Sequence, residues 1–225
     1  MHLEIRKTKD GSNTLFVPEL NEHYHSVHGA LQESLHVFIK HGLEHVTSFK
    51  KDVKILEIGF GTGLNAILTY PVALAKKAFI QYDTLEKFPL QNEVVNQLQF
   101  DRAILNPELH DVFLRMHQTP WNEPVDLIPY FTLQKIHETL EEFVAPQSYY
   151  DLVYFDAFAP EKQPELWSEE MFTKLYNATR PGGVLVTYCA KGSFKRSLKA
   201  AGFEVEALPG PPGKREMTRG VKPVA

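Results

Sequence analysis

The stretch that decides the fold is VKILEIGFGTGLN, residues 53–65. Its first part, Val53–Ile58, is a short apolar run typical of a buried strand, and it leads directly into a glycine-rich loop. An open α/β sheet places its ligand crevice at such a point. A dinucleotide-binding loop would need a glycine where Leu64 stands, and the Lys-Ser/Thr ending of a P-loop is missing. The loop therefore predicts a ligand site but excludes both phosphate-binding patterns.

Apolar runs alternate with helical patterns along the rest of the chain, which is typical of an α/β protein. Their near-continuous Val, Ile, Leu, Phe and Tyr content indicates central strands covered on both faces. Seven strands are expected, at Val53–Ile58, Ala78–Leu85, Tyr130–Ile136, Asp151–Asp156, Gly183–Cys189, Phe203–Leu208 and Arg215–Val221. We therefore expect a Rossmann-like α/β fold with a mostly parallel seven-stranded sheet and helices on both faces.

Helices are expected between these strands and before the first one. They cover Leu64–Thr69, Pro89–Phe100, 169–178 with Ser168 as N-cap, and 194–201 with Ser193 as N-cap. Apolar residues from Leu31 to Leu43 keep the spacing of one buried helical stripe. The proline-containing stretch Asp101–Asp126 is expected to be a mostly irregular insertion. We expect an N-terminal extension with its helix, residues 1–50, and one compact domain, residues 51–225.

Composition limits the class of protein further. The chain has 225 residues, 43% hydrophobic and 23% charged, which excludes disorder, coiled coil and collagen. No apolar run is long enough to span a membrane and the start lacks a secretory signal, so a cytoplasmic location is expected. The single cysteine, Cys189, predicts a core side chain, without a disulfide or a thiolate metal site. His23, His25 and His28 lack further ligands at metal-binding spacing, so no metal is expected.

The form Gly-x-Gly-x-Gly, preceded in its strand by Glu57, resembles the first motif of class I S-adenosylmethionine-dependent methyltransferases. The ligand of those enzymes brings an amino acid and a ribose but no phosphate. An acid after the second strand is then needed for the ribose hydroxyls, and Glu86 is the candidate. Each charge-assisted hydrogen bond to the diol would contribute about 1.5–3 kcal/mol if well buried.

A second acid, Asp156, ends the fourth strand and is followed by Phe158. In such a sheet this is where the methyl acceptor meets the sulfonium. Methyl transfer is an in-line displacement, so the protein mainly has to align an uncharged nucleophile. A carboxylate beside an amine would accept its hydrogen bond, orient its lone pair and take up the released proton. Asp156 is therefore the candidate catalytic residue, and an amine is the favoured acceptor.

Six ordered motifs carry a closer resemblance. They are GFGTGLN (59–65), LEKFPL (85–90), FDAFAP (155–160) with PELW (164–167), RPGG (180–183), GKREM (213–217) and YHS (24–26) with the helix after it. Together they resemble the methyltransferase part of the tRNA 5-methylaminomethyl-2-thiouridine biosynthesis family. The resemblance implies N-methylation of the 5-aminomethyl group of wobble uridine in tRNA, with S-adenosyl-L-methionine as cofactor.

The resemblance also implies partners and contacts. Upstream tRNA-modifying enzymes would install the aminomethyl group, and the FAD-dependent oxidoreductase domain of many members is expected to be absent. The implied cofactor contacts are Glu57, Gly59, Gly61, Gly63, Asn65, Glu86, Lys87 and Gln134. Where the family commonly has an acid for the adenine end, this chain has TLQKIHE (132–138), so either Gln134 or Glu138 could make that contact.

Candidate substrate contacts lie in the N-terminal segment and the C-terminal region. The net charge is −4, yet residues 190–225 carry +5 and the remainder −9, which permits a basic rim for tRNA phosphates. Lys214 and Arg215 are the preferred contacts within it. Phe158 is the preferred stacking partner for a flipped base, with Trp167, Tyr24 and Tyr188 as other candidates. Tyr24 or His25 is expected in a cap facing the acceptor.

Two alternatives stay open. A small-molecule amine methyltransferase or an aminopropyltransferase on the same sheet would have an acidic pocket without a basic rim. A catalytically silent RNA-binding module would not bind the cofactor, although Gly61 and Glu86 are both present.

Overall fold

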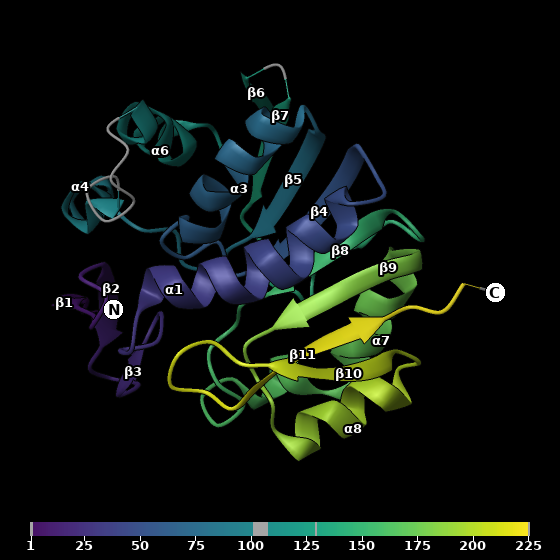
Figure 1. The fold of residues 1–225 in the computed structure, drawn as a ribbon. Helices are drawn as coiled ribbons and strands as arrows, with labels where there is room; N and C mark the ends of the chain where they lie inside the picture. Colours follow the sequence, from purple (N-terminus) through teal and green to yellow (C-terminus); the bar gives the residue numbers. More distant parts are fainter. Residues whose placement is uncertain (1, 101–107, 129, 225) are drawn as a thin grey trace.

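The main sheet contains eight strands in the computed structural model, which describes residues 2–100, 108–128 and 130–224 (Figure 1). Their order is β10-β11-β9-β8-β4-β5-β7-β6, and the five from β9 to β7 are parallel. The strands are β4 (Asp52–Ile58), β5 (Phe79–Leu85), β6 (Pro124–Ile128), β7 (Phe131–Ile136), β8 (Tyr150–Phe155), β9 (Thr179–Thr187), β10 (Glu204–Pro209) and β11 (Glu216–Val221). The α/β class and the seven expected strands are confirmed. The expected total of seven strands is wrong, because the sheet also contains β6, an antiparallel edge strand.

The direction in which strands are added to the sheet reverses between β4 and β8. From β4 the chain continues through β5 and β7 toward one edge, whereas β8 and β9 build toward the other. All six residues of β8 are buried, as expected for a central strand with covered faces. The loops that follow β4 and β8 therefore diverge at the carboxyl edge of the sheet, where doubly wound folds open a ligand crevice.

Helices cover both faces of the sheet, as expected. One face carries a long continuous helix made of α1 (Ala30–Ser34), η1 (Leu35–Leu43) and α2 (Glu44–Thr47), together with α3 (Leu64–Lys76). The other carries α7 (Glu169–Ala178) and α8 (Gly192–Ala200). Figure 1 shows the long helix crossing the sheet in front of β4 and β8. The single cysteine, Cys189, is a core residue on the α7 and α8 face.

The middle of the long helix has widened π-type turns. At its end the Glu44 amide donates to the Ile39 carbonyl, five residues earlier instead of four. Gly42 faces the sheet, and a Cβ there would lie 3.0 Å from Val186 Cγ2 and 3.2 Å from Tyr154 Cε1. Glycine thus lets the helix backbone lie directly on β8 and β9, which fixes the height of the helix over the sheet.

A small antiparallel sheet precedes the long helix, and no pattern in the sequence predicted it. It consists of β1 (Glu4–Lys7), β2 (Asn13–Val17) and β3 (Glu22–His23). Figure 1 shows it beside the amino end of the long helix. Tyr24 and His25 follow β3 directly, so this sheet delivers both to the carboxyl edge of the main sheet. The division of the chain at residue 50 stays a prediction.

Several local expectations are corrected. The stretch 101–126 is not mostly irregular, because it contains α6 (Glu108–Gln118) and the start of β6; its residues 101–107 lie outside the described part. Helix α4 (Asn92–Leu98) begins after Pro89, not at it. Ser168 caps α7 as expected, accepting a hydrogen bond from the Met171 amide at 3.3 Å, whereas α8 begins one residue before Ser193.

Within the described ranges, none of the helices is both long enough and apolar enough to traverse a lipid bilayer.

Candidate functional site

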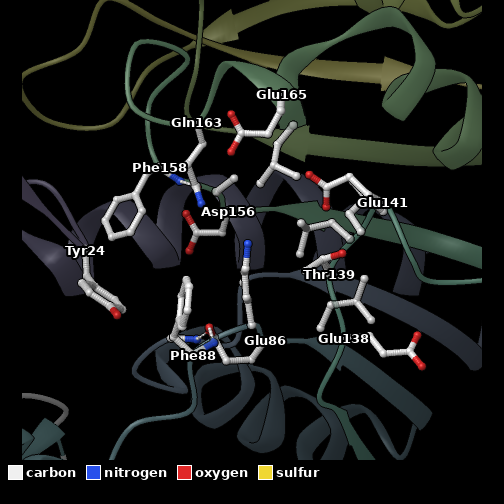
Figure 2. A pocket seen from close by; sticks show the side chains of 18 of the residues that line it. Tyr24, Glu86, Phe88, Glu138, Thr139, Glu141, Asp156, Phe158, Gln163 and Glu165 are labelled. Carbon is white, nitrogen blue, oxygen red and sulfur yellow. Dashed lines mark hydrogen bonds between the residues drawn. The ribbon is translucent and has the colours of Figure 1, made fainter. Parts of the chain in front are cut away.

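A cavity of about 1020 Å³, including its mouth, opens at the carboxyl ends of β4, β5 and β8 (Figure 2). In Figure 2 the rings of Tyr24 and Phe158 lie on one side and Glu138 and Glu141 on the other, with Asp156 between them. The lining residues are Leu20, Tyr24, His25, Ile58, Gly59, Gly61, Thr62, 85–88, 138–141, 156–158, Gln163, Glu165 and Leu166. This is the crevice predicted from the glycine loop.

The glycines of the loop after β4 are required by its geometry. Gly59, Gly61 and Gly63 all have positive φ, at 91°, 50° and 72°. A Cβ on Gly59 would lie 2.9 Å from the Asp156 carbonyl oxygen, and one on Gly63 would lie 2.9 Å from His117 Nε2. The first two glycines line the cavity, whereas Gly63 packs against α6 behind it. The loop thus presents backbone to a ligand and keeps β4 and β8 close together.

Glu86 ties this loop to the segment after β5. Its Oε2 accepts the Gly61 amide at 2.8 Å, and its Oε1 accepts the Phe88 amide at 2.7 Å. A carboxylate has about four acceptor positions, so these bonds leave others for a ligand in the cavity. Lys87 also lines the cavity, as does the adjacent Phe88, a residue that is 53% exposed. Glu86 therefore has the place that a ribose-binding acid needs.

An amide joins two carboxyl groups behind the loop. Asn65 Nδ2 on α3 donates to Glu57 Oε1 at 3.0 Å and to Asp156 Oδ2 at 2.8 Å. Glu57 is fully buried and also accepts the Thr84 hydroxyl at 2.7 Å. Glu57 and Asn65 are thus behind the cavity wall, and only Asp156 of the three lines it. The Asn65 side-chain oxygen is buried without a hydrogen-bond partner among the described residues.

These surroundings change the protonation of both carboxyl groups. Burial raises the pKa of Glu57 to about 8, against the bonds from Thr84 and Asn65 that lower it. Loss of hydration likewise raises the pKa of Asp156 to about 7, and the Asn65 bond opposes the change. Glu57 is then mainly protonated at neutral pH, whereas Asp156 is about half protonated because its pKa is close to that pH. A carboxyl group with such a pKa is suited to accept a proton from a bound ligand.

A second cavity adjoins the first. The two share Tyr24, His25, Ala157 and Phe158, and the Tyr24 and Phe158 rings meet edge to face with centroids 5.1 Å apart. The other lining residues of the second cavity are Glu22, His23, Ser26, Val27, Glu33, Ala159, Tyr188 and Lys214. A ligand in each cavity would therefore meet the other beside Asp156.

The two basic residues expected to contact substrate lie in different places. Lys214 lines the second cavity and forms an ion pair with Glu33 on α1, whereas Arg215 is exposed on the surface. Trp167, another candidate stacking residue, is 5% exposed and packs in the core between Phe155 and Phe194. The stacking candidates that reach a cavity are Tyr24, Phe158 and Tyr188.

His25 contacts both the N-terminal sheet and the glycine loop. Its Nδ1 lies 3.2 Å from the Thr14 hydroxyl and its Nε2 3.3 Å from the Thr62 hydroxyl. Burial lowers the pKa of His25 to about 4, so the ring is neutral at physiological pH. No group of His, Cys, Asp and Glu side chains in the described residues has a metal-binding arrangement.

The adenine contact is narrowed by the positions of the two candidates. Gln134 lies inside β7, paired with Asp83 on β5 and Pro124 on β6, and is outside the cavity lining. Glu138, four residues later, lines the cavity. Of the two candidates for the adenine contact, Glu138 thus lines the cavity and Gln134 does not, and the contact stays a prediction.

Sequence reasoning missed two residues that support the site. Glu33 reaches it through the long helix, and no local pattern marks it as different from other helix glutamates. His117 on α6 donates from Nε2 to the Thr62 carbonyl at 3.1 Å, while Lys135 Nζ donates to the His117 carbonyl at 2.6 Å. The apolar residues of α6 that are buried, Leu109, Phe113 and Met116, keep helical spacing and would have revealed this helix.

Comparison with known proteins identifies the class of this fold. Residues 130–223 match a family described as S-adenosyl-L-methionine-dependent methyltransferase. The crystal structure of MNMC2 from Aquifex aeolicus superposes with a TM-score of 0.77 and 28% identity, covering 99% of this chain and 72% of that one. Spermidine synthase from Thermotoga maritima covers 99% of this chain and 73% of its own, at a TM-score of 0.53 and 14% identity, which shows a shared fold alone.

Sequence similarity extends along the chain. The tRNA 5-methylaminomethyl-2-thiouridine biosynthesis bifunctional protein MnmC of Cupriavidus necator is 31% identical over 214 residues, which cover 90% of this chain and 32% of that protein. The chain thus spans about a third of the length of the curated relatives it matches. Over about 90% of its length the chain is accordingly similar to the tRNA 5-methylaminomethyl-2-thiouridine biosynthesis proteins, and it has the fold of the S-adenosyl-L-methionine-dependent methyltransferases.

Proposed function

We propose that the chain methylates the 5-aminomethyl group of wobble uridine in tRNA, with S-adenosyl-L-methionine as methyl donor, giving 5-methylaminomethyl-(2-thio)uridine. The observation that carries the proposal is the place of Asp156. Its carboxyl group lines the first cavity, and the next two residues, Ala157 and Phe158, line both cavities. The names of the relatives supply the tRNA substrate.

The residues around the first cavity fit this cofactor. The backbone at Gly59 and Gly61 is open to a ligand, and Glu86 keeps acceptor positions for the ribose hydroxyls. From behind the cavity wall, the Asn65 amide holds the Asp156 carboxyl group that lines the cavity. Glu138 would contact the adenine side. We also propose that Gly63, Glu57 and Lys87 support the residues that contact the cofactor.

Asp156 would perform the proton chemistry. S-adenosyl-L-methionine supplies a methyl group already activated on a sulfonium sulfur, so no strong base is required. Asp156 accepts a hydrogen bond from the amine and thereby orients the lone pair of the amine nitrogen toward the methyl group. It takes the N–H proton as the new C–N bond forms. Its pKa of about 7 leaves much of the carboxyl group ionised at neutral pH.

The second cavity would hold the base. The Tyr24 and Phe158 rings at its inner end provide flat faces against which an unstacked uracil can pack. The exposed Arg215 and the cations of α8 would contact tRNA phosphates. The proposal places the protein in the cytoplasm, and it requires an upstream reaction that installs the aminomethyl group on the uridine.

One observation favours a second candidate, a small cationic amine as acceptor. The first cavity is lined by the carboxylates Glu138, Glu141 and Glu165, and the second contains Glu22 and Glu33. Acidic pockets suit a polyamine. A small-molecule amine methyltransferase or aminopropyltransferase therefore stays as the alternative, and the experiment must separate it from tRNA methylation.

The test uses methyl-labelled S-adenosyl-L-methionine with tRNA from cells that lack this methyltransferase, followed by digestion to nucleosides. We expect label in 5-methylaminomethyl-(2-thio)uridine and none in putrescine or spermidine. Asp156→Asn preserves the shape of the side chain and an acceptor for Asn65, so it should bind the cofactor nearly normally by calorimetry while transfer falls by about 10²–10⁴-fold. Label in a polyamine alone, or full turnover by the variant, would refute the assignment.

A further inference from the structure

An ion pair joins two distant parts of the chain in the second cavity. Lys214 Nζ lies 2.5 Å from Glu33 Oε2, although the residues are 181 positions apart. Glu33 Oε1 also accepts the Ser26 amide at 3.2 Å. The side chain of Glu33 is only 9% exposed, and that of Lys214 is 30% exposed. Such shielding makes this pair different from a solvent-screened surface ion pair.

Other contacts fix the position of Lys214 in the second cavity. Gly213 has a φ of +87°, and a Cβ there would lie 2.7 Å from His28 Cδ2, so glycine lets this loop reach the N-terminal segment. Lys214 Nζ lies 4.0 Å from the centre of the Tyr188 ring. The Tyr188 hydroxyl donates to the Ala157 carbonyl at 2.9 Å. The lysine therefore packs on the ring of Tyr188, whose hydroxyl binds the residue that follows Asp156.

Charged and titratable groups face Asp156 from each element around it. They are Glu33 on α1, Glu57 on β4, Tyr82 on β5, Tyr188 after β9 and Lys214 between β10 and β11, with the Asn65 amide on α3. Burial is the largest influence and raises the pKa of Asp156, the Asn65 bond lowers it, Glu33 raises it and Lys214 lowers it. The two members of the ion pair thus act on Asp156 in opposite directions.

We propose that Glu33 and Lys214 are positioning residues that set the charge of the Asp156 carboxyl group during methyl transfer. Lys214 supplies a positive charge that favours the ionised form. Glu33 holds this lysine in place and limits its effect, so that Asp156 can both accept and release a proton near neutral pH.

The inference rests on the proposed function in one respect, the use of Asp156 as proton acceptor. In that step the amine nitrogen forms a bond to the methyl carbon, the carbon–sulfur bond breaks, and the N–H proton moves to a carboxylate oxygen. A protonated Asp156 cannot take this proton, so turnover needs the ionised form. The charge of Asp156 therefore sets the acid limb of the pH profile.

Substitutions of the two residues should move that limb in opposite directions. Lys214→Met removes the positive charge and should move the acid limb of kcat/KM to higher pH by about one unit. Glu33→Gln removes the negative charge and should move it to lower pH, while Lys214→Arg should leave it near the wild-type position. The double variant should lie between the single variants. Shifts in the same direction, or no shift, would overturn the proposal.

An ion pair at the opposite end of β8 supplies the control. Lys50 and Asp151 are also 2.5 Å apart, with side chains 29% and 8% exposed, but Asp151 is the second residue of β8 whereas Asp156 follows its end. The five residue steps from Asp151 to Asp156 span about 16 Å. Lys50→Met therefore breaks an ion pair of similar exposure far from Asp156, while Arg180 stays 3.5 Å from Asp151, and it should leave the limb in place.

A measurement without substrate separates this inference from the proposed function. With aspartate labelled at its carboxyl carbon with ¹³C, NMR follows the titration of Asp156, whose signal is assigned by its loss in Asp156→Asn. We expect the same opposite shifts for Lys214→Met and Glu33→Gln. If no acceptor is methylated, the proposed function fails and the titration still decides the inference. If Lys214→Met does not fold, the titration of Glu33→Gln alone decides the inference. An unchanged titration midpoint of Asp156 in that variant refutes the proposal.

Discussion

Asn65 lies between two carboxyl groups with different expected charges. Glu57, wholly buried, has a pKa raised by burial to about 8, and Asp156 has one raised to about 7. Two carboxyl groups bridged by one amide are more stable when one of them is protonated, because the bridge then adjoins a single negative charge. The protonated state of Glu57 thus leaves Asp156 as the group that ionises. The effect of Glu57 on the site therefore depends on its being uncharged.

Glu57 should therefore make stability depend on pH. Its ordinary pKa of 4.5 applies to the unfolded chain, so between about pH 5 and 8 the folded state keeps a proton that the unfolded state has released. Its contribution is complete below pH 4.5 and declines as the pH rises toward 8. In Glu57→Gln, the amide can accept from Asn65 and donate to Thr84, and this decline should disappear.

The measurement is the free energy of unfolding by urea across that range for Glu57→Gln and wild type. The difference between them should grow in favour of the variant as the pH rises. Glu44→Gln removes a carboxylate at an exposed position of α2 and should run parallel to wild type. A constant offset between Glu57→Gln and wild type would show that Glu57 is ionised in both states.

At the scale of elements, α6 supports the glycine loop from outside the crevice. Burial lowers the pKa of His117 to about 4, so its neutral ring can donate to the Thr62 carbonyl at physiological pH. His117→Ala removes that bond and should weaken S-adenosyl-L-methionine binding by about 0.5–1.5 kcal/mol. His117→Gln, which can place an amide where Nε2 lies, should recover most of the affinity in calorimetry. Equal dissociation constants for wild type and His117→Ala would limit α6 to a packing role.

The same scale shows what the sequence predicts and what it leaves out. Strands β4 and β8 are apolar runs that end in chemistry-bearing residues, so local composition was enough to place the glycine loop and Asp156. The segment Glu4–Lys7 has no such run, and it is a strand only because it pairs with β2. The prolines around α6 led to the prediction of an irregular segment, although the apolar residues of α6 keep helical spacing. Contacts such as Glu33 to Lys214 depend on residues 181 positions apart, which no local pattern encodes.

On the whole molecule, ion pairs reduce the positive charge of the C-terminal region. Four of its eight cations have carboxylate partners: Lys191 with Glu161, Lys195 with Glu216, Lys214 with Glu33 and Arg219 with Glu206. Lys222 donates to the carbonyls of Tyr176 and Thr179. Arg196, Lys199 and Arg215 are exposed and form no ion pair with a carboxylate in the described part of the chain, so the basic rim available to phosphates is narrower than the sequence suggested.

Neutralising these three cations as Arg196→Gln, Lys199→Gln and Arg215→Gln should weaken tRNA binding. The slope of log affinity against log salt should fall by about one for each phosphate that the protein no longer neutralises, because fewer counterions are released on binding. Lys77→Gln, at the exposed end of α3, is the control and should keep the wild-type slope. If the triple variant also keeps it, the tRNA approaches another face.

The widened turns of η1 determine the rotation of Glu33 about the long helix. Gly42 is fixed on β8 and β9, and Glu33 lies nine residues earlier on the same continuous helix. Each residue advances an α-helix by about 100°, so a chain one residue shorter within η1 would keep its helix and its seat on the sheet. Glu33, however, would turn away from Lys214. A deletion in a segment remote from the crevice would thus change the acid strength of the Asp156 carboxyl group without replacing any residue that lines the first cavity.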